Sequence, residues 1–147
     1  MHRPSFPIVL ILTAVSLSVQ AAPEFLPLDA DKMRAMELES IPPFPAEIVL
    51  EGESQNWESV LHQGDFVVSV YEAAPAVIDV SDPFPYDEFV LVLEGEVTLT
   101  NVDGRTATYK VGDTFLVPKG WLGTWDMPVK YREMIVIETD ALLAGEI

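Results

Sequence analysis

The chain has 147 residues, 49% of them hydrophobic and 10% aromatic, which suffices for the packed core of one domain. Its 24 acidic and 8 basic residues give a formal net charge of -16, which repels nucleic-acid phosphates and anionic membranes, so nucleic-acid binding is excluded from the expected functions. It has no cysteine, so no disulfide contributes to its stability, and its 12 prolines and 8 glycines favour strands and turns over long helices.

The N-terminus has the pattern of a secretory signal peptide. A short basic start precedes an apolar run over 8–19, and small side chains lead to a cleavage site expected after Ala21. A cut one residue later would place Pro23 beside the scissile bond. The apolar run is shorter than the ~20 residues that a membrane span needs, so no stable membrane anchor is expected after cleavage. The sequence predicts a signal peptide over 1–21 and a secreted or periplasmic protein.

Residues 22–47 are expected to form an N-terminal arm, because prolines recur along them. Within the arm, either a short helix forms over 29–39, with Asp29 or Asp31 as its N-cap, or the segment stays extended. The remaining residues, 48–147, are expected to form the folded domain.

Short apolar runs alternate with turn residues through that domain. Asp103-Gly104 is a strong hairpin signal, and glycines at the other corners permit the positive φ of tight turns. We expect strands over 48–50, 66–71, 76–80, 87–93, 97–100, 106–111, 114–117, 123–127 and 131–138, and a helical turn over 141–144. Short strands at close spacing predict an all-β fold, a small antiparallel barrel or jelly roll.

Two sets of spaced residues carry a family resemblance. Glu88 and Gly95 are separated by six residues, and Gly112, Pro118 and Gly120 have fixed spacings further along the chain. These spacings resemble the two motifs of the cupin family, and within it the small-barrel subgroup that includes the (S)-ureidoglycine aminohydrolase cupin domain. The resemblance covers about residues 57–139, and it implies a single antiparallel jelly-roll (cupin) barrel behind the N-terminal arm.

Cupins hold a metal ion with histidines that this chain lacks. The two histidine positions of the first motif hold Asp82 and Phe84, or their preceding neighbours with a longer spacer, and that of the second holds Gly123. Of four ligands implied by the resemblance only Glu88 remains, whereas a transition metal needs three or four donors. We therefore expect no metal and no cofactor.

Two further features could supply ligands for a cation. His62 precedes a Gly-Asp turn, where a single histidine is usually solvated. Asp79 and Asp82 could supply oxygen donors beside Glu88, but their spacing does not predict a hard-cation site.

Side-chain alternation along 87–93 makes a prediction about assembly. If Glu88 faces the barrel interior, as the resemblance implies, then Phe89, Leu91 and Leu93 face outwards. This outer face is too apolar to lie in water, so either the N-terminal arm or a second subunit must cover it. We expect a homodimer that pairs through this face.

Glu88 is the candidate for chemistry. Burial of a carboxylate raises its pKa unless the group is paired, and such a group can act as a general acid or base in catalysis. The alternative is a structural carboxylate that bonds to the backbone or to Tyr86, Lys130 or Arg132.

Four aromatic residues are candidates for ligand binding together with Glu88, namely Tyr71, Tyr86, Trp121 and Trp125. Aromatic faces with a few polar groups suit sugars or small planar organic molecules. Plain core packing is the alternative for each of them.

Three functions stay open. The first is a metal-free cupin that binds a small organic molecule or sugar, as an accessory or sensing protein. The second is a hydrolase or isomerase that resembles ureidoglycine aminohydrolase, with Glu88 as its acid or base. The third is a structural dimer without a ligand. The missing histidines favour the first.

Overall fold

The structure, a computed structural model, describes residues 22–145; the predicted signal peptide over 1–21 lies outside the described residues. The strands are β1 (Glu39–Ile41), β2 (Val49–Gly52), β3 (Asn56–Gln63), β4 (Phe66–Ala73), β5 (Ala76–Val80), β6 (Glu88–Glu94), β7 (Glu96–Asn101), β8 (Thr106–Lys110), β9 (Thr114–Val117), β10 (Gly123–Met127) and β11 (Tyr131–Glu138). The helices are α1 (Ala30–Ala35), the 3-10 turn η1 (Ala46–Ile48) and α2 (Thr139–Gly145).

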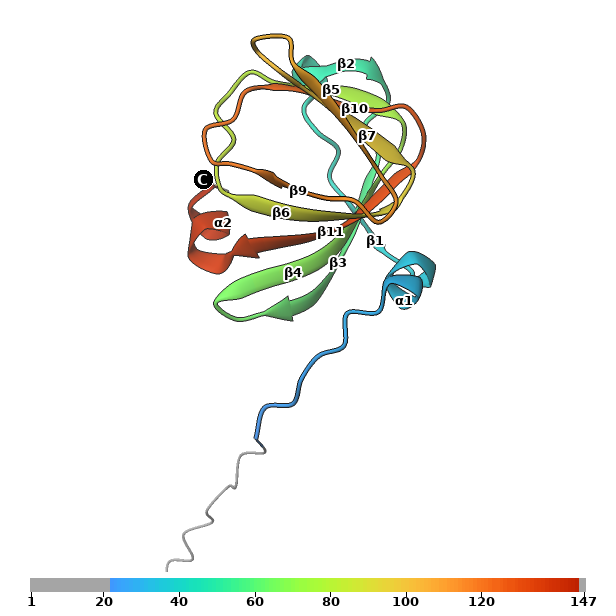
Figure 1. Cartoon of the computed structure of the whole chain (residues 1–147), viewed down its shortest axis with the longest axis vertical. Coiled ribbons are helices and arrows are strands. Elements are labelled where there is room, and N and C mark those ends of the chain that lie inside the picture. Colours follow the sequence, from blue (N-terminus) through green and yellow to red (C-terminus); the bar gives the residue numbers. More distant parts are fainter. Residues whose placement is uncertain (1–21, 146–147) are drawn as a thin grey trace, which may run out of the picture.

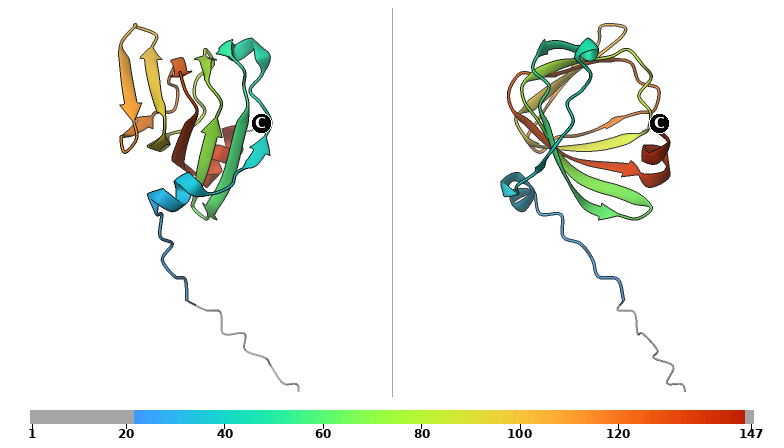
Figure 2. Two further views of the ribbon diagram at one scale, coloured as in Figure 1. Left: turned by 90° about the vertical axis from the view of Figure 1, so that its right-hand side faces the viewer. Right: turned by 180° about the vertical axis from the view of Figure 1, so that it is seen from behind.

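Two antiparallel sheets face each other as a jelly roll (Figures 1 and 2). The six-stranded sheet has the order β1-β3-β4-β11-β6-β9, and the five-stranded sheet has the order β2-β5-β10-β7-β8. They are not joined into one closed cylinder. The predicted all-β jelly-roll fold is confirmed, and none of the helices in residues 22–145 is long and apolar enough to cross a membrane.

The nine predicted strands all form, within a few residues of the expected bounds. The turn glycines Gly95, Gly104, Gly112 and Gly120 have φ of 75°, 83°, 91° and 86°, a region that side chains other than glycine rarely occupy. Two strands were not predicted. β1 is only three residues long, and β3 has a bulge between Val60 and His62 that breaks the alternation of apolar and polar residues. His62 therefore lies in a strand rather than in a loop.

The N-terminal arm covers part of the outer face of the six-stranded sheet. Asp29 caps α1 by accepting a hydrogen bond from the backbone N of Lys32 at 2.9 Å. Met33 of α1 is 3% exposed and packs in one apolar cluster with Leu93. The predicted outward face of β6 is thus apolar, and the arm covers its far end, while Phe89 stays 39% exposed.

Arg132 fixes the arm to this outer face. Its guanidinium is buried, donates to Glu72 Oε2 from Nε at 2.7 Å, and forms an ion pair with the same carboxylate. Its Nη1 donates to the backbone carbonyls of Met33, Arg34 and Met36 at 3.0, 2.6 and 3.1 Å. Arg132 therefore does not pair with Glu88, which lies on the opposite face of the sheet.

The space between the sheets is packed at one end. Val90, Val92 and Val97 are 0% exposed there. Phe115 stacks on Tyr109 with ring centroids 4.3 Å apart, which closes this end with aromatic surface. The other end of the same space is hollow.

Candidate functional site

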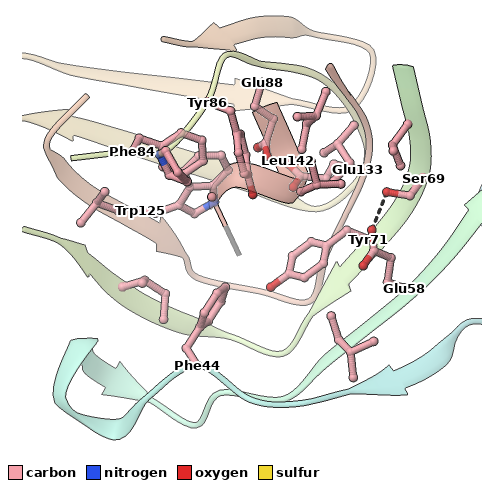
Figure 3. Close-up of a pocket in the computed structure, with 18 of the residues that line it drawn as sticks. Phe44, Glu58, Ser69, Tyr71, Phe84, Tyr86, Glu88, Trp125, Glu133 and Leu142 are labelled. Atoms are coloured by element: carbon pink, nitrogen blue, oxygen red, sulfur yellow. Dashed lines mark hydrogen bonds between the residues drawn. The ribbon is translucent and has the colours of Figure 1, made fainter. Parts of the chain in front are cut away.

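A cavity of about 800 Å³ occupies the open end of the space between the sheets (Figure 3). We call it the inter-sheet cavity. Its walls come from β3, β4, β6 and β11 on one side and from β5 and β10 on the other, with the 81–86 loop and α2 at its edge. Its volume lies within the range of small-molecule sites in proteins.

Glu88 points into the cavity from the start of β6. Its side chain is 6% exposed, and it lies between Ile137 of β11 and Val117 of β9 in the sheet register. Val90 and Val92 share its face and are buried, as the alternation predicts. None of the hydrogen bonds formed among residues 22–145 involves its carboxyl group, whose oxygens are accessible from the cavity. Burial, and then the negative charge of Glu58, raise its pKa to about 8.

Four more carboxyl groups line the same cavity, of which Asp79 and Asp82 were named from the sequence and Glu58 and Glu133 were not. Glu133 of β11 is 3% exposed and accepts a hydrogen bond from the Tyr131 hydroxyl at 2.5 Å. Burial and then the charge of Glu88 raise its pKa well above the usual range, against the opposing effect of the Tyr131 hydrogen bond. Glu58 of β3 is half-buried and accepts from the Ser69 hydroxyl at 2.5 Å.

The electrostatic field of these carboxyl groups reaches the neighbouring tyrosine. Tyr71 lies among them in Figure 3, and its hydroxyl donates to Asn56 Oδ1 at 2.9 Å. Burial, followed by the charges of Glu133, Glu88 and Glu58, raises the pKa of its phenol far above the ordinary value. Tyr71 therefore stays protonated, and it offers the cavity a neutral ring.

Aromatic side chains form much of the remaining wall. Phe84 and Tyr86 meet edge to face with ring centroids 5.3 Å apart, and both line the cavity. Trp125, 9% exposed, lies beside Phe84 in Figure 3. Phe44, from the segment before η1, faces them across the cavity.

The predicted binding residues are mostly brought together. Tyr71, Tyr86, Glu88 and Trp125 all line the cavity, whereas Trp121 does not. Trp121 packs edge to face against Trp125 at 6.4 Å, and its indole N–H donates to Asn101 Oδ1 at 2.7 Å. Trp121 therefore supports the wall from behind. Alternation could have placed Glu133 on the inner face, since Glu133, Ile135 and Ile137 share one parity in β11.

The cavity does not fit the metal ion that cupins commonly hold. Gly123 occupies the position of one expected histidine, and a Cβ added there would lie 2.0 Å from the carbonyl oxygen of Thr100 and 2.7 Å from the Trp121 ring. No side chain can project from this point without moving backbone. Within residues 22–145, no group of three or more His, Cys, Asp or Glu side chains is arranged to hold a metal ion.

Comparison with known protein families identifies the family. The profile of the EutQ-like cupin domain matches residues 60–133, half of the chain. The chain belongs to the EutQ-like cupin family. The predicted cupin resemblance is therefore confirmed, while the finer resemblance to ureidoglycine aminohydrolase stays a hypothesis. No sequence among the curated proteins matches this cupin.

Solved structures share the fold at low identity. A protein of unknown function from Pseudomonas syringae pv. tomato is 22% identical with a TM-score of 0.65 over 71% of this chain, which spans only 45% of that protein's length. A cupin-like protein from Thermotoga maritima is 16% identical with a TM-score of 0.54, covering 74% of this chain and 83% of its own. A putative ethanolamine utilization protein Q from Salmonella typhimurium is 18% identical with a TM-score of 0.50, covering 69% and 94%. At these identities the likeness shows the fold alone.

Proposed function

We propose that this EutQ-like cupin is a binding protein that holds a small organic molecule in its inter-sheet cavity, as an accessory or sensing component. The observation that carries the proposal is Glu88, a buried carboxyl group that faces about 800 Å³ of space without a hydrogen-bond partner among the described residues. Its oxygens are accessible from the cavity, so a donor group of a ligand that enters can bond to them.

A ligand screen with a blocked cavity tests this proposal. Leu142 of α2 lines the cavity, while its neighbour Leu143 is 53% exposed and does not. We expect ligand-observed NMR with a mixed set of cationic, neutral and anionic aromatic fragments to detect binding to the wild type. Leu142→Trp should abolish the binding, and the matched control Leu143→Trp should retain it. If no class of fragment binds, or if both variants bind like the wild type, the cavity is not the site.

A second candidate function rests on the pKa of Glu88. A value of about 8 lets one carboxyl group give and take a proton near neutral pH, as a general acid or base requires. In this reading the protein is a hydrolase or isomerase that resembles ureidoglycine aminohydrolase. Release of ammonia from (S)-ureidoglycine, lost in Glu88→Gln, would support it. Equal release by the wild type and the variant would contradict it.

We also propose that two copies pair through the outer face of the six-stranded sheet. Phe89 and Leu116 lie opposite each other in neighbouring strands and are 39% and 57% exposed, beyond the part that α1 covers. Light scattering should give a dimer mass at micromolar concentration, and Phe89→Lys should give a monomer. A monomeric wild type would contradict this pairing and leave a structural dimer without support.

Export stays a proposal that rests on the N-terminal pattern. Cell fractionation should place the mature chain outside the cytoplasm, and N-terminal sequencing should find Ala22 as its first residue. Retention of Met1 on the purified chain would contradict it.

A further inference from the structure

The charged residue types in the described wall of the inter-sheet cavity are all acidic. Five acidic side chains line it, namely Glu58, Asp79, Asp82, Glu88 and Glu133. Among residues 22–145, no Lys, Arg or His side chain contributes to its wall. The basic residues nearest to Glu133 in sequence lie outside the cavity. Arg132 binds the arm on the outer face, and Lys130 pairs with Glu72 and Glu94. An anionic ligand would meet no positively charged side chain in the described part of this wall.

A second observation points to a ligand. Glu88 is more than nine-tenths buried and is aimed into the cavity, and it has no hydrogen-bond partner among the described residues. Glu133, similarly buried, accepts one hydrogen bond among residues 22–145, from the Tyr131 hydroxyl. Each carboxylate has room for about four hydrogen bonds, so most of the acceptor positions of this pair are open to a donor in the cavity.

The aromatic wall has the complementary property. Tyr71, Tyr86 and Trp125 present ring surface to the same space as the carboxyl groups (Figure 3). The face of an aromatic ring is electron-rich and attracts ammonium groups, most strongly when water is excluded. Carboxylates together with ring faces are the combination that recognises an organic ammonium ion.

We propose that the ligand of the inter-sheet cavity is a small organic cation, an amine or quaternary ammonium compound with an apolar body. The inference rests on the proposed binding function and names its ligand class. The ammonium group lies against Glu88 and Glu133, and the apolar body lies against the aromatic wall. A positive charge beside the two buried carboxyl groups favours their ionised forms and so offsets the repulsion between them.

A neutral sugar would use the open acceptors less well. Its hydroxyl groups can donate to Glu88, but they bring no positive charge to offset three neighbouring carboxyl groups. A hydroxyl donor to a carboxylate also lacks the Coulomb attraction that an ammonium donor adds to its hydrogen bond. Charge, rather than ring shape, should therefore decide which ligand binds.

Three compounds of nearly equal shape separate these possibilities, namely phenethylamine, phenethyl alcohol and hydrocinnamate. Binding is measured by titration calorimetry with the full mature chain at neutral pH. We expect phenethylamine to bind roughly 10- to 100-fold more tightly than phenethyl alcohol, and hydrocinnamate not to bind. Tighter binding of the alcohol or of the acid would overturn the cation assignment while leaving cavity binding intact. Failure of all three at millimolar concentration would overturn both.

Two variants locate the charge. Glu88→Gln keeps the size of the side chain but cannot ionise, and it should lower the affinity for phenethylamine by roughly tenfold with little effect on phenethyl alcohol. Glu138→Gln is the matched control, because Glu138 ends β11 exposed to solvent and away from the cavity. Thermal denaturation of each variant confirms that it is folded. An equal loss of affinity in both variants would show a general effect of net charge and would contradict the site.

Discussion

Arg132 and Glu133 are adjacent in β11, but they lie on opposite faces of the sheet and differ in how many hydrogen-bond partners they have. Arg132 projects to the outer face, where one carboxylate and three arm carbonyls accept its hydrogen bonds. Glu133 projects to the inner face, where one tyrosine hydroxyl is its only donor and Glu88 nearby has none among the described residues. Both side chains are less than 10% exposed.

The contrast is between a charged group that stabilises the fold and acidic groups that lower its stability. A buried ion with all its partners holds elements together, whereas buried like charges without partners lower stability. Sites for ligands are where such a cost is retained, because the ligand supplies the missing partner. The outer face therefore stabilises the protein, whereas the inner face, on the proposed function, binds a ligand.

Removing the charge of Arg132 on the outer face should have the largest effect on the free energy of unfolding. Arg132→Leu removes the closest partner of the half-buried Glu72 and the donor to three arm carbonyls, so we expect a loss of about 3–5 kcal/mol in the free energy of unfolding. Urea denaturation measures it. The control is Lys130→Gln, which removes an exposed partner of the same Glu72 and should cost at most about 1 kcal/mol. Equal losses in the two variants would contradict the anchoring role of Arg132.

Removing the inner carboxyl group of Glu88 should raise, rather than lower, the free energy of unfolding. The pKa of Glu88 is raised from 4.5 to about 8, so the folded state binds this proton more tightly than the unfolded state. Its stabilising contribution is complete below pH 4.5 and is lost as the pH rises through 8. Glu88→Gln should therefore raise the unfolding free energy at pH 8 by roughly 1–3 kcal/mol. The gain is smaller than the pKa shift alone would give, because the glutamine amide also has no hydrogen-bond partner there.

The pH profile sharpens this expectation. Wild-type stability should fall between pH 5 and pH 8, and the profile of Glu88→Gln should be flatter, with Glu133 accounting for the remaining slope. Glu138→Gln, on the exposed end of β11, should follow the wild type within about 0.5 kcal/mol. Destabilisation by Glu88→Gln at every pH would instead make Glu88 a structural carboxylate.

The arm offers the smallest test. Asp29→Ala removes the N-cap of α1 and should cost about 1 kcal/mol, while Asp29→Asn keeps the acceptor and should cost little. Hydrogen exchange of the Met33 amide should increase in the alanine variant, because α1 then leaves the outer face more often. No change in either quantity would show that the cap does not hold the arm in place.

The sequence predicted most of the fold for a local reason. Runs such as 87–93 and 114–117 alternate with glycine turns, and both signals are contained within a few residues. β3 was missed because its bulge shifts Val60 and His62 out of the simple two-residue period. A strand of that kind is specified by its partner β4 rather than by its own pattern.

The site was predicted only in part, for a different reason. Glu88 was found through a motif spacing, and the aromatic candidates were named because aromatic faces suit small planar ligands. Glu133 escaped because β11 is buried on both faces, so its sequence shows no contrast between an inner and an outer side. Glu58 escaped with the unpredicted β3. That these two meet Glu88 depends on strand order, which no local pattern contains.

The state of the inner carboxyl groups tests the central claim most directly. Carboxyl carbon NMR of the selectively glutamate-labelled protein, with Glu88→Gln and Glu133→Gln for assignment, follows their protonation against pH. The pair should titrate with apparent pKa values far above 4.5, one of them near 8, and saturating phenethylamine should lower these values. Titration of both groups near 4.5 in the free protein would show that they are solvated or paired. It would contradict the claim that the inner face holds carboxyl groups with open acceptor positions for a ligand.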